Sequence, residues 1–298
     1  MVAQTEATPT TPTLNSMDDA FDPKVLTFVS SVLDRLTRAY FRFQLRGTHN
    51  LPAGKCVVVG NHSGLGIADI ACLLGAWPRA FGPTRRTVGL MADSFIKAPV
   101  AGEFFLAVGA VPASRENADY VLEQGHSLLV YPGGELDCCR PLHQPRDVVF
   151  GSRRGYIRLA LHHKVPVVPL ATIGSHWTLP MLPGGFLAAR LLGARKLLRN
   201  ERFPIAITWI IGLCGVGLGL AGLIPWWAAV ASFLLGISPL PARVTSELMP
   251  PIDVAALTAH VKDEDERIEL AHRIVHGALQ KAVREMEHGQ HGASAPPC

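Results

Sequence analysis

An uninterrupted apolar run from Cys56 to Val59, ending at Gly60, restricts the fold of this chain more than any other feature of its sequence. A strand that is apolar at every position is buried on both faces, and such strands belong mainly to parallel sheets covered by helices. The chain of 298 residues is long enough to build one domain of that kind.

Five further stretches have the character of strands, and helical patterns lie between several of them. The strand-like stretches are Phe41–Arg46, Thr87–Met91, Ala107–Val111, Ser127–Tyr131 and Val165–Leu170. Helical patterns cover residues 69–78, 117–124 and Arg153–His162. Because strands and helices alternate along the chain, we predict an α/β fold with a mainly parallel sheet flanked by helices on both faces.

The first 45 residues divide into a tail and a helix. Residues 1–20 are rich in Thr, Pro and Ala, without a basic start or an apolar run, so we expect a disordered tail and no signal peptide. Asp22 followed by Pro23 is typical of a helix start, and apolar residues recur at helical spacing within residues 21–45. This amphipathic helix is expected either to lie on a membrane surface or to pack against the domain core.

Residues 203–242 contain no charged side chain and no histidine, although charged residues make up 17% of the chain. Ile205–Ile224 is a stretch of 20 residues. As a helix it is ~30 Å long, the thickness of the hydrocarbon core of a bilayer. Pro225 interrupts it, and Trp226 and Trp227 follow as an aromatic pair typical of a membrane interface. We expect a membrane-associated insertion that forms a bent or re-entrant hairpin; a helix lying in the interface and a buried core element are the alternatives.

Basic residues immediately before this insertion predict its orientation. They alternate with leucines and comprise Arg190, Arg195, Lys196, Arg199 and Arg202. Basic residues beside a membrane element favour the cytoplasmic leaflet, so we expect the protein to be membrane-associated at the cytoplasmic face. The net charge of +4 is modest, and no basic run with interleaved aromatics predicts nucleic-acid binding.

The remaining segments follow from composition. After the N-terminal helix we expect an α/β core at 46–202, the insertion at 203–242, a C-terminal part of the core with its helix at 243–288, and a disordered tail at 289–298. Within the amphipathic helical pattern at 263–287, His272 and His276 share one face and could bind a metal. No third ligand is evident nearby, so we predict no metal site.

The segment from Gly60 to Asp69 carries the strongest functional signal. His62 comes directly after the apolar run, and the carboxyl end of a strand is where α/β proteins build their sites. Glycines at 60, 64 and 66 allow the backbone to turn and to approach a ligand. Asp69 begins the next helix, from which its carboxylate could fix the imidazole tautomer and leave the other ring nitrogen as proton acceptor. A histidine that only caps a loop is the alternative for this segment taken alone.

Three further elements join strands to polar or glycine-rich residues. Arg115 stands between an expected strand and a helix, where a guanidinium could hold a phosphate or carboxylate. Gly133, Gly134 and Glu135 follow the next strand, and prolines punctuate the strand-like stretch Val165–Leu170. Each element taken alone is typical of an ordinary turn or sheet edge. The order in which the elements occur along the chain is what indicates a function.

In that order the blocks resemble those of the lysophospholipid acyltransferase superfamily, also called the glycerolipid or 1-acylglycerol-3-phosphate acyltransferases. The blocks are Asn61-His62 through Asp69, Gly109 through Asn117, Tyr131-Pro132-Gly133-Gly134-Glu135, and Val165 through Leu170. The resemblance covers roughly residues 40–180. The Pro-Gly-Gly-Glu version of the third block is similar to the monoacylglycerol acyltransferase-like branch.

The resemblance implies an O-acyltransferase of lipid metabolism, of the kind used in phospholipid biosynthesis, that acts at a membrane. His62 would act as general base on a hydroxyl of a glycerolipid or lysophospholipid acceptor, and Asp69 would orient its ring. The acyl donor would be acyl-CoA, as a co-substrate, or an acyl carrier protein, with no other cofactor. Gly133 and Gly134 are candidate oxyanion donors through their backbone N–H groups, and we expect Arg115 and Glu135 to line the acceptor site.

Two departures from the family pattern bear on this hypothesis. The family's histidine block reads H-x-x-x-x-D, whereas six residues separate His62 from Asp69 here, so the loop must bulge for the pair to meet. The family's third block, Phe-Pro-Glu-Gly-Thr-Arg-Ser, carries an arginine associated with a phosphate-bearing acceptor. Only Arg140 could replace that arginine here, and it is out of register.

Two rival functions stay open at this stage. The first is a serine hydrolase or esterase that uses Ser63, although the G-x-S-x-G pattern would place the serine one position earlier. The second is a non-catalytic, membrane-binding relative of the acyltransferases, which the long spacing between His62 and Asp69 would favour.

Overall fold

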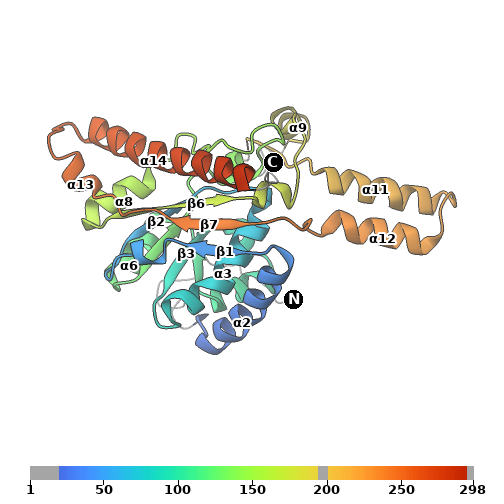
Figure 1. The fold of residues 1–298 in the computed structure, drawn as a ribbon, viewed down its shortest axis with the longest axis horizontal. Helices are drawn as coiled ribbons and strands as arrows, with labels where there is room; N and C mark the ends of the chain where they lie inside the picture. Colours follow the sequence, from blue (N-terminus) through green and yellow to red (C-terminus); the bar gives the residue numbers. More distant parts are fainter. Residues whose placement is uncertain (1–19, 194–200, 294–298) are drawn as a thin grey trace, which may run out of the picture.

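The computed structural model describes residues 20–193 and 201–293 and contains a seven-stranded sheet at its centre (Figure 1). The strands are β1 (Gln44–Arg46), β2 (Val57–Gly60), β3 (Thr87–Met91), β4 (Ala110–Pro112), β5 (Ser127–Val130), β6 (Val167–Ile173) and β7 (Thr245–Leu248). Their order across the sheet is β1-β7-β6-β2-β5-β3-β4.

The sheet is mainly parallel. Strands β6, β2, β5, β3 and β4 all run parallel to one another. β7 is antiparallel to β6, and β1 runs parallel to β7. In the middle, Val57 of β2 lies opposite Val167 of β6 and Leu128 of β5. The prediction of an α/β fold with a mainly parallel sheet is therefore confirmed.

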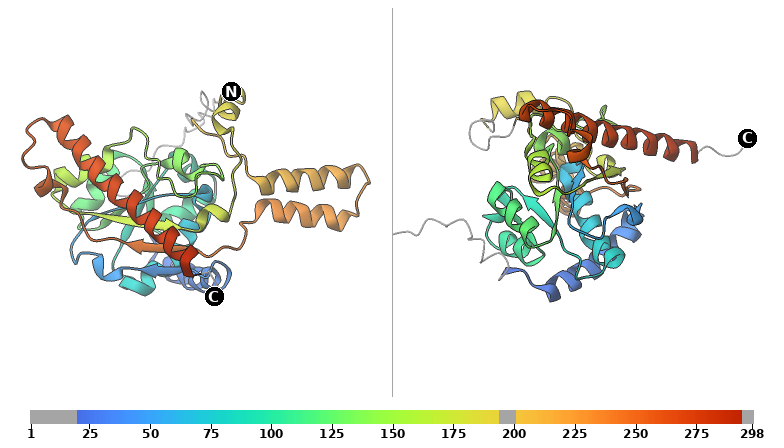
Figure 2. Two further views of the ribbon diagram at one scale, coloured as in Figure 1. Left: turned by 45° about the horizontal axis from the view of Figure 1, so that its top comes forward. Right: turned by 90° about the vertical axis from the view of Figure 1, so that its left-hand side faces the viewer.

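Helices cover both faces of the sheet, which explains why β2 is apolar at every position. Val57 and Val59 face a core shared with α6 (Arg115–Glu123), α8 (Gly155–His163) and the long α14 (Glu264–Ala293). Val58 faces the opposite core, shared with α3 (Ile67–Phe81), on which α2 (Pro23–Tyr40) packs. Figure 2 shows α14 crossing its face of the sheet diagonally.

Shorter elements lie between these. They are the helices α4 (Asp93–Ile96), α5 (Ala101–Ala107), α7 (Gly134–Cys138), α9 (Gly185–Leu191) and α13 (Val254–Leu257), and the 3-10 turns η1 (Thr48–Asn50), η2 (Gly64–Gly66) and η3 (Ser175–Trp177).

Some boundaries differ from those expected. The strand expected from Ala107 begins only at Ala110, because α5 continues to Ala107 and Gly109, at a φ of 92°, then turns the chain into β4. The strand expected from Val165 begins at Val167, because α8 first ends in a left-handed residue, Lys164. α14 continues to Ala293, past the expected start of the tail at residue 289.

Several expectations fall on residues that the structure does not describe. The expected N-terminal tail lies outside the described residues up to residue 19, and the expected C-terminal tail does so from residue 294 onward. So do three of the basic residues before the insertion, Arg195, Lys196 and Arg199.

The N-terminal helix α2 packs on the domain through its polar face. Asp22 caps it, accepting the N–H groups of Lys24 and Val25, as the sequence predicted. Its inward residues are polar: Ser30, Asp34 and Thr37 are buried, and Asp34 pairs with Arg38 and Arg79. Its exposed side carries an apolar stripe, Phe28, Val32, Leu36 and Tyr40. The helix thus packs against the domain and also presents an apolar face outward.

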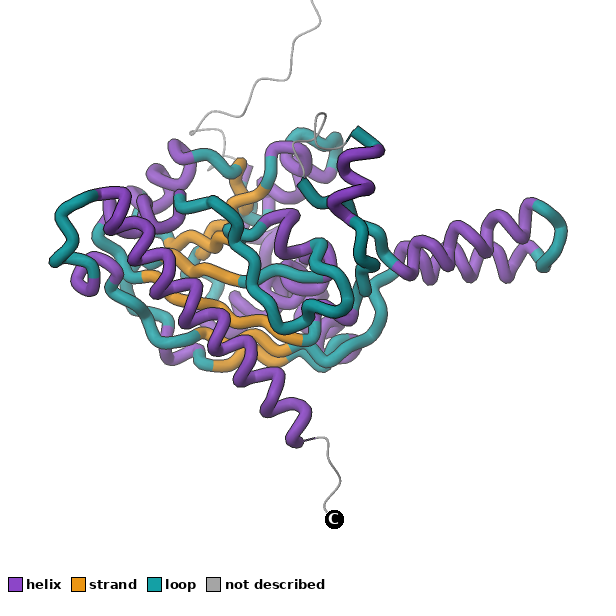
Figure 3. Tube along the Cα trace, turned by 90° about the horizontal axis from the view of Figure 1, so that it is seen from above, coloured by secondary structure: helices purple, strands orange, loops and turns teal. Residues whose placement is uncertain are grey.

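The uncharged insertion forms a helical hairpin that projects from the domain (Figures 1 and 3). It consists of α11 (Ile207–Leu220) and α12 (Trp226–Ile237). Small residues let the two helices approach closely: Gly212 lies against Gly236, Gly215 against Ser232 and Gly219 against Ala229.

Large apolar side chains of the hairpin point away from both helices and are exposed, among them Leu213, Leu220, Leu223, Trp226 and Trp227. The hairpin interpretation fits this arrangement, and the alternative of a buried core element is wrong. Among the helices of the described residues, none combines the length and the apolar character needed to cross a membrane.

The close approach of α2 to α3 generates a testable prediction about stability. A Cβ atom at Gly75 of α3 would lie 2.6 Å from the backbone nitrogen of Asp34 in α2. We therefore expect Gly75→Ala to lower the free energy of unfolding by about 1–3 kcal/mol through overpacking, measured by chemical denaturation. Gly277→Ala is the matched control, because Gly277 is an exposed glycine of α14 with open space around it. There the better helix propensity of alanine should stabilise the protein by up to ~1 kcal/mol. Equal effects of the two changes would contradict the packing argument.

Candidate active site

His62 lies at the carboxyl edge of the sheet, two residues after the end of β2. The preceding residue anchors the loop: the Asn61 side chain donates to the Thr172 carbonyl and accepts the Thr172 N–H, both at 2.8 Å. Thr172 belongs to β6, the neighbour of β2. The start of the His62 loop is therefore fixed to the next strand by a two-point contact.

The His62 and Asp69 side chains meet. His62 Nδ1 is 3.1 Å from Asp69 Oδ2, and the same oxygen accepts the Ser63 N–H at 2.9 Å. The Asp69 side chain is fully buried, and the His62 ring is almost so. A buried carboxylate that accepts from Nδ1 fixes the proton on that nitrogen, which leaves Nε2 as the basic nitrogen of the ring.

Three consecutive left-handed residues accommodate the long spacing between His62 and Asp69. Gly64, Leu65 and Gly66 have φ values of 55°, 57° and 73°. This tight turn takes up the extra residues and brings Asp69, in the first turn of α3, back to the ring. Gly66 is also required by contact, because a Cβ atom there would overlap the His62 ring. The bulge that the sequence required is thus built around glycines.

Tyr131 covers one face of the His62 ring. The two rings stack with centroids 4.3 Å apart and an interplanar angle of 22°. Tyr131 follows β5, the other neighbour of β2, and burial raises the pKa of its phenol well above the ordinary value. The phenol therefore stays neutral and gives the imidazole an uncharged, rigid wall.

A buried ion pair holds the backbone of His62, and the sequence did not reveal it. Asp137 accepts the His62 N–H at 2.6 Å, and Arg140 donates to the His62 carbonyl at 3.1 Å. Asp137 and Arg140 also pair with each other, and both are buried. Burial raises the pKa of Asp137, whereas the Arg140 charge and the N–H groups of His62 and Val149 oppose that rise. Both polar backbone groups of His62 are thus satisfied by one pair of side chains.

Arg140 is not placed to bind a phosphate-bearing acceptor. Its guanidinium is only 1% exposed. It donates to Asp137 and to the carbonyls of His62 and Gln144. The possibility that Arg140 replaces the phosphate-binding arginine of the family pattern therefore finds no support in its position.

Gly133, Gly134 and Glu135 lie at the same edge, after β5, where Gly133 caps α7 and Gly134 and Glu135 begin it. Glu135 pairs with Arg153 at 2.7 Å, and Arg153 also donates to the Gly133 carbonyl at 3.0 Å. The Gly134 N–H is donated to the Tyr131 carbonyl at 3.2 Å. The role of oxyanion donor therefore remains a prediction for Gly133 rather than for both glycines.

Arg115 lies apart from the His62 group. It begins α6, after β4 at the far edge of the sheet, and two strands separate β4 from β2. At the ordinary spacing between strands this is a separation of roughly 14 Å. The Arg115 side chain is 70% exposed and lies 3.5 Å from Asp119. The structure brings Glu135 to the edge near His62 but leaves Arg115 on the surface of α6.

Ser63 is not arranged as a nucleophile. Its hydroxyl is buried and lies 2.5 Å from the Ser175 hydroxyl, while the neighbouring His62 uses Nδ1 to contact Asp69. None of the hydrogen bonds of the described residues joins Ser63 Oγ to a histidine. The arrangement therefore gives no support to the hydrolase alternative.

An apolar cavity of about 150 Å³ lies behind Tyr131, between the sheet and the helices α2, α3 and α5. Its walls include Leu73, Trp77, Leu90, Phe105 and Leu129. Because Tyr131 both lines this cavity and stacks on His62, the cavity begins one ring away from the imidazole.

Comparison with known proteins gives consistent results. The sequence profile of a family described as Acyltransferase matches residues 42–173. An uncharacterized protein of Mycobacterium tuberculosis is 31% identical over 198 residues, covering 64% of this chain and 54% of that protein. Human diacylglycerol O-acyltransferase 2 is 28% identical over 150 residues, covering 48% of this chain and 38% of the enzyme. The chain thus spans about half the length of the curated relatives it matches, or less.

Among solved structures, the 1-acyl-sn-glycerophosphate acyltransferase PlsC of Thermotoga maritima is similar, with a TM-score of 0.50 at 16% identity. The similarity covers 87% of this chain and 81% of that one. At this level of identity the match establishes the fold.

The buried pair that holds His62 generates a prediction. Asp137→Ala would leave the Arg140 charge buried without its partner, which costs about 3–5 kcal/mol of unfolding free energy. Glu269→Ala removes the partner of Arg154 from a pair that is partly exposed, and should cost less than about 1 kcal/mol. Chemical denaturation of both variants measures the difference. If Asp137→Ala were no more destabilising than Glu269→Ala, the pair would not hold the loop as described.

Proposed function

We propose that this chain, a member of the glycerolipid acyltransferase superfamily on the branch that includes the mono- and diacylglycerol acyltransferases, transfers a fatty acyl group from a thioester to a glycerolipid hydroxyl. The observation that carries the proposal is the contact between His62 and Asp69 at the carboxyl edge of a parallel sheet, beside an apolar cavity. This contact also removes the reason for regarding the chain as a non-catalytic relative, which was the long spacing between the two residues.

In the proposed reaction His62 acts as general base. Asp69 holds the proton on Nδ1, so Nε2 accepts the proton of the acceptor hydroxyl as its oxygen attacks the thioester carbonyl. The resulting tetrahedral intermediate carries a negative charge on oxygen, for which the Gly133 N–H is the candidate donor. Collapse of the intermediate breaks the carbon–sulfur bond, and the imidazolium returns its proton to the thiolate of the leaving CoA or acyl carrier protein. The products are the acylated acceptor and the free thiol.

The cavity behind Tyr131 is the proposed site of the acyl chain. Its lining is mainly aliphatic and aromatic, which suits a hydrocarbon chain, and its position puts the chain's carboxyl end near the His62 edge. Tyr131 stands between the cavity and the imidazole and has no hydrogen-bond partner for its hydroxyl within the described structure.

For the acceptor we propose an uncharged acylglycerol rather than a phosphate-bearing lysolipid. Arg140 is buried and saturated by its own contacts, and Arg115 lies apart from His62 on the surface of α6. Arg153, at the edge near His62, is paired with Glu135. An acceptor without a phosphate needs no free arginine at this edge.

The hairpin and α2 form the proposed membrane-binding surface. The hairpin has no charged residue, and the apolar stripe of α2 ends at Tyr40, whose hydroxyl donates to the Pro239 carbonyl at the base of the hairpin. With 14 and 12 residues, the helices are only ~21 and ~18 Å long. They are long enough to enter one leaflet of a bilayer whose hydrocarbon core is ~30 Å thick.

The base of the hairpin is connected to the His62 loop. The Leu240 N–H donates to the Thr178 carbonyl at 2.6 Å, and Met181 bridges Ala206 on the other arm. Thr178 and Ser175 in turn lie against Gly64 of the left-handed turn. A hairpin inserted in a bilayer would therefore hold the His62 edge next to the lipid surface, where both acyl chains and glycerolipid acceptors partition.

The general-base role of His62 generates the first prediction of function. General-base assistance contributes ~10²–10⁴-fold in rate, so His62→Ala should lower acyl transfer by that factor while the fold is kept. Asp69→Asn should lower the rate less, because the ring retains part of its positioning from Tyr131. Single-turnover rates at saturating acyl-CoA, with monoacylglycerol, diacylglycerol and lysophosphatidic acid as acceptors, measure both effects.

His49→Ala is the matched control, because His49 is an exposed histidine on η1, and its rate should equal that of the unaltered protein. Near-normal transfer by a folded His62→Ala variant would exclude the mechanism. A preference for lysophosphatidic acid over the acylglycerols would exclude the uncharged acceptor and leave the general base intact.

Membrane binding by the hairpin generates the second prediction. Leu220 and Trp227 are 86% and 62% exposed, so changing both to Asp should not disturb packing. Each charge placed in hydrocarbon costs ~2.5–3.5 kcal/mol, so partitioning into neutral phosphatidylcholine vesicles should fall roughly 50-fold or more. Co-sedimentation with the vesicles measures it.

Leu257→Asp on α13 is the control, since it puts the same charge on an exposed leucine outside the hairpin and α2. It should leave vesicle binding unchanged. Unaltered protein that stays in the supernatant with vesicles present, or a double variant that still co-sediments, would contradict the assignment.

A further inference from the structure

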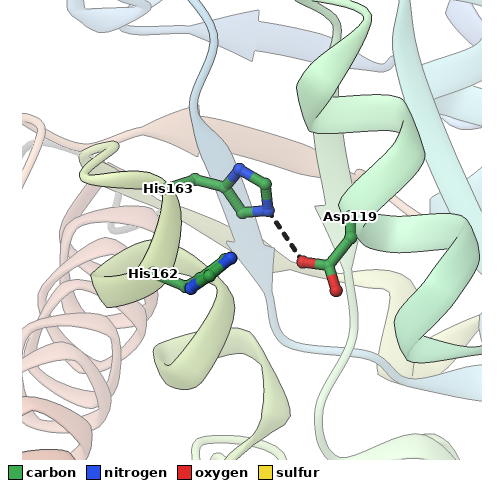
Figure 4. Close-up of side chains that lie close together, drawn as sticks. All are labelled: Asp119, His162 and His163. Atoms are coloured by element: carbon green, nitrogen blue, oxygen red, sulfur yellow. Dashed lines mark hydrogen bonds and ion pairs between the residues drawn. The ribbon is translucent and has the colours of Figure 1, made fainter.

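A group of three potential metal ligands lies at the junction of α6 and α8 (Figure 4). Asp119 of α6 and His162 and His163 of α8 each place one candidate ligand atom within 4.8 Å of the other two. In Figure 4 both imidazole rings direct a nitrogen toward the side of α6 that carries Asp119. The group has no part in the proposed acyl transfer.

Two of the three residues already contact each other. His163 Nε2 lies 2.7 Å from Asp119 Oδ1, and the His163 side chain is only 8% exposed. His162 is exposed and can adjust its ring without disturbing the core. The two histidines also occupy the last turn of α8, where the negative end of the helix dipole favours a cation.

The second oxygen of Asp119 has a separate partner. Arg115 Nε is 3.5 Å from Asp119 Oδ2, while His163 contacts Oδ1. A metal ion bound by Oδ1 would therefore replace the proton shared between Asp119 and His163 and leave the Arg115 contact in place. Hydrogen bonding of the outer oxygen is the usual way in which a ligating carboxylate is oriented. Arg115 is largely exposed, so solvent screens its repulsion of the ion.

The histidine pair of α14 that the sequence indicated is different. His272 and His276, which share a face of α14, each have a hydrogen-bond partner: the Tyr156 hydroxyl at 2.8 Å for His272 and the Val148 carbonyl at 2.9 Å for His276. Burial also lowers the pKa of His272 to about 4. That pair supports the packing of α14. Among the described residues, no carboxylate or thiol lies close enough to complete a metal site with these two histidines.

We propose that Asp119, His162 and His163 bind a divalent transition-metal ion, with Zn²⁺ as the occupant that this donor set fits best. Two imidazoles and one carboxylate are ligands that zinc accepts, and three protein ligands leave a fourth tetrahedral position for water. Mg²⁺ and Ca²⁺ are disfavoured, because they require oxygen ligands. α8 runs from the His62 edge toward the start of β6, so the site lies toward the opposite edge of the sheet. The ion would link α6 to α8 and stabilise the domain rather than take part in catalysis.

The test uses the full chain without a polyhistidine tag, titrated with Zn²⁺ by calorimetry and with Co²⁺ by visible absorption. One ion per chain is expected, and bound Co²⁺ should show no thiolate charge-transfer band. His162→Ala removes an exposed ligand and should fold normally. It should weaken zinc binding more than ~100-fold, beyond the 10–100-fold loss typical of an outer-shell change. Asp119→Asn should also weaken zinc binding.

His49→Ala is the matched control, and its zinc affinity should be that of the unaltered chain. Absence of a one-to-one site, or equal zinc affinity in His162→Ala and the unaltered chain, would overturn the proposal and leave the Asp119–His163 contact as a hydrogen bond between helices. A thiolate band with Co²⁺ would also overturn it, because the ion would then be held by cysteine. The binding measurement does not depend on acyl transfer, so the two proposals fail or stand separately.

Discussion

The buried pair of Asp137 and Arg140 is the interaction on which the candidate active site depends. Two charges removed from water are costly unless nearly every lone pair and N–H is satisfied. Here Asp137 accepts from His62, Val149 and Arg140, and Arg140 reaches the carbonyls of His62 and Gln144. The groups that offset the desolvation of the pair are thus largely the backbone groups of His62 and its surroundings. Once that backbone is fixed, only the ring remains to be oriented, and Asp69 and Tyr131 do so from two sides.

The elements that depend on local pattern could be predicted from the sequence, and those that depend on distant partners could not. β2 is apolar at every position because both of its faces are covered, so its place and the position of His62 after it followed directly. β7 has no such signal. Its residues Thr245 and Ser246 are small and polar, and Ser246 lies opposite Thr172 of β6, with which its hydroxyl forms a hydrogen bond. No periodicity within β7 reports that partner, which lies far away in the chain.

The same distinction applies within the site. The glycines at 64 and 66 indicated a turn, and the turn closes the gap between His62 and Asp69, although nothing marked Leu65 as a third left-handed residue. The sequence could not show which charged residues near the site are buried and which are exposed. Arg140, considered as a ligand for phosphate, is the most deeply buried arginine of the site, whereas Arg115 remains at the surface with Asp119. Which charge is buried depends on the three-dimensional position of the His62 carbonyl.

The positions of charge around the hairpin relate the proposed membrane surface to the site. The uncharged segment is bracketed by Arg202 before it and Arg243 after it. Arg202 donates to the carbonyl of Leu136, next to Asp137, and the backbone carbonyl of Arg243 lies against Gly174, just beyond the end of β6. Both arginines therefore mark the level of the carboxyl edge of the sheet. If the uncharged hairpin enters hydrocarbon, the first charged residue on each arm marks where the uncharged surface ends, at the level of the lipid headgroup layer. That layer then lies at the height of His62, so an acceptor hydroxyl at the membrane surface needs no extraction into water to reach the imidazole.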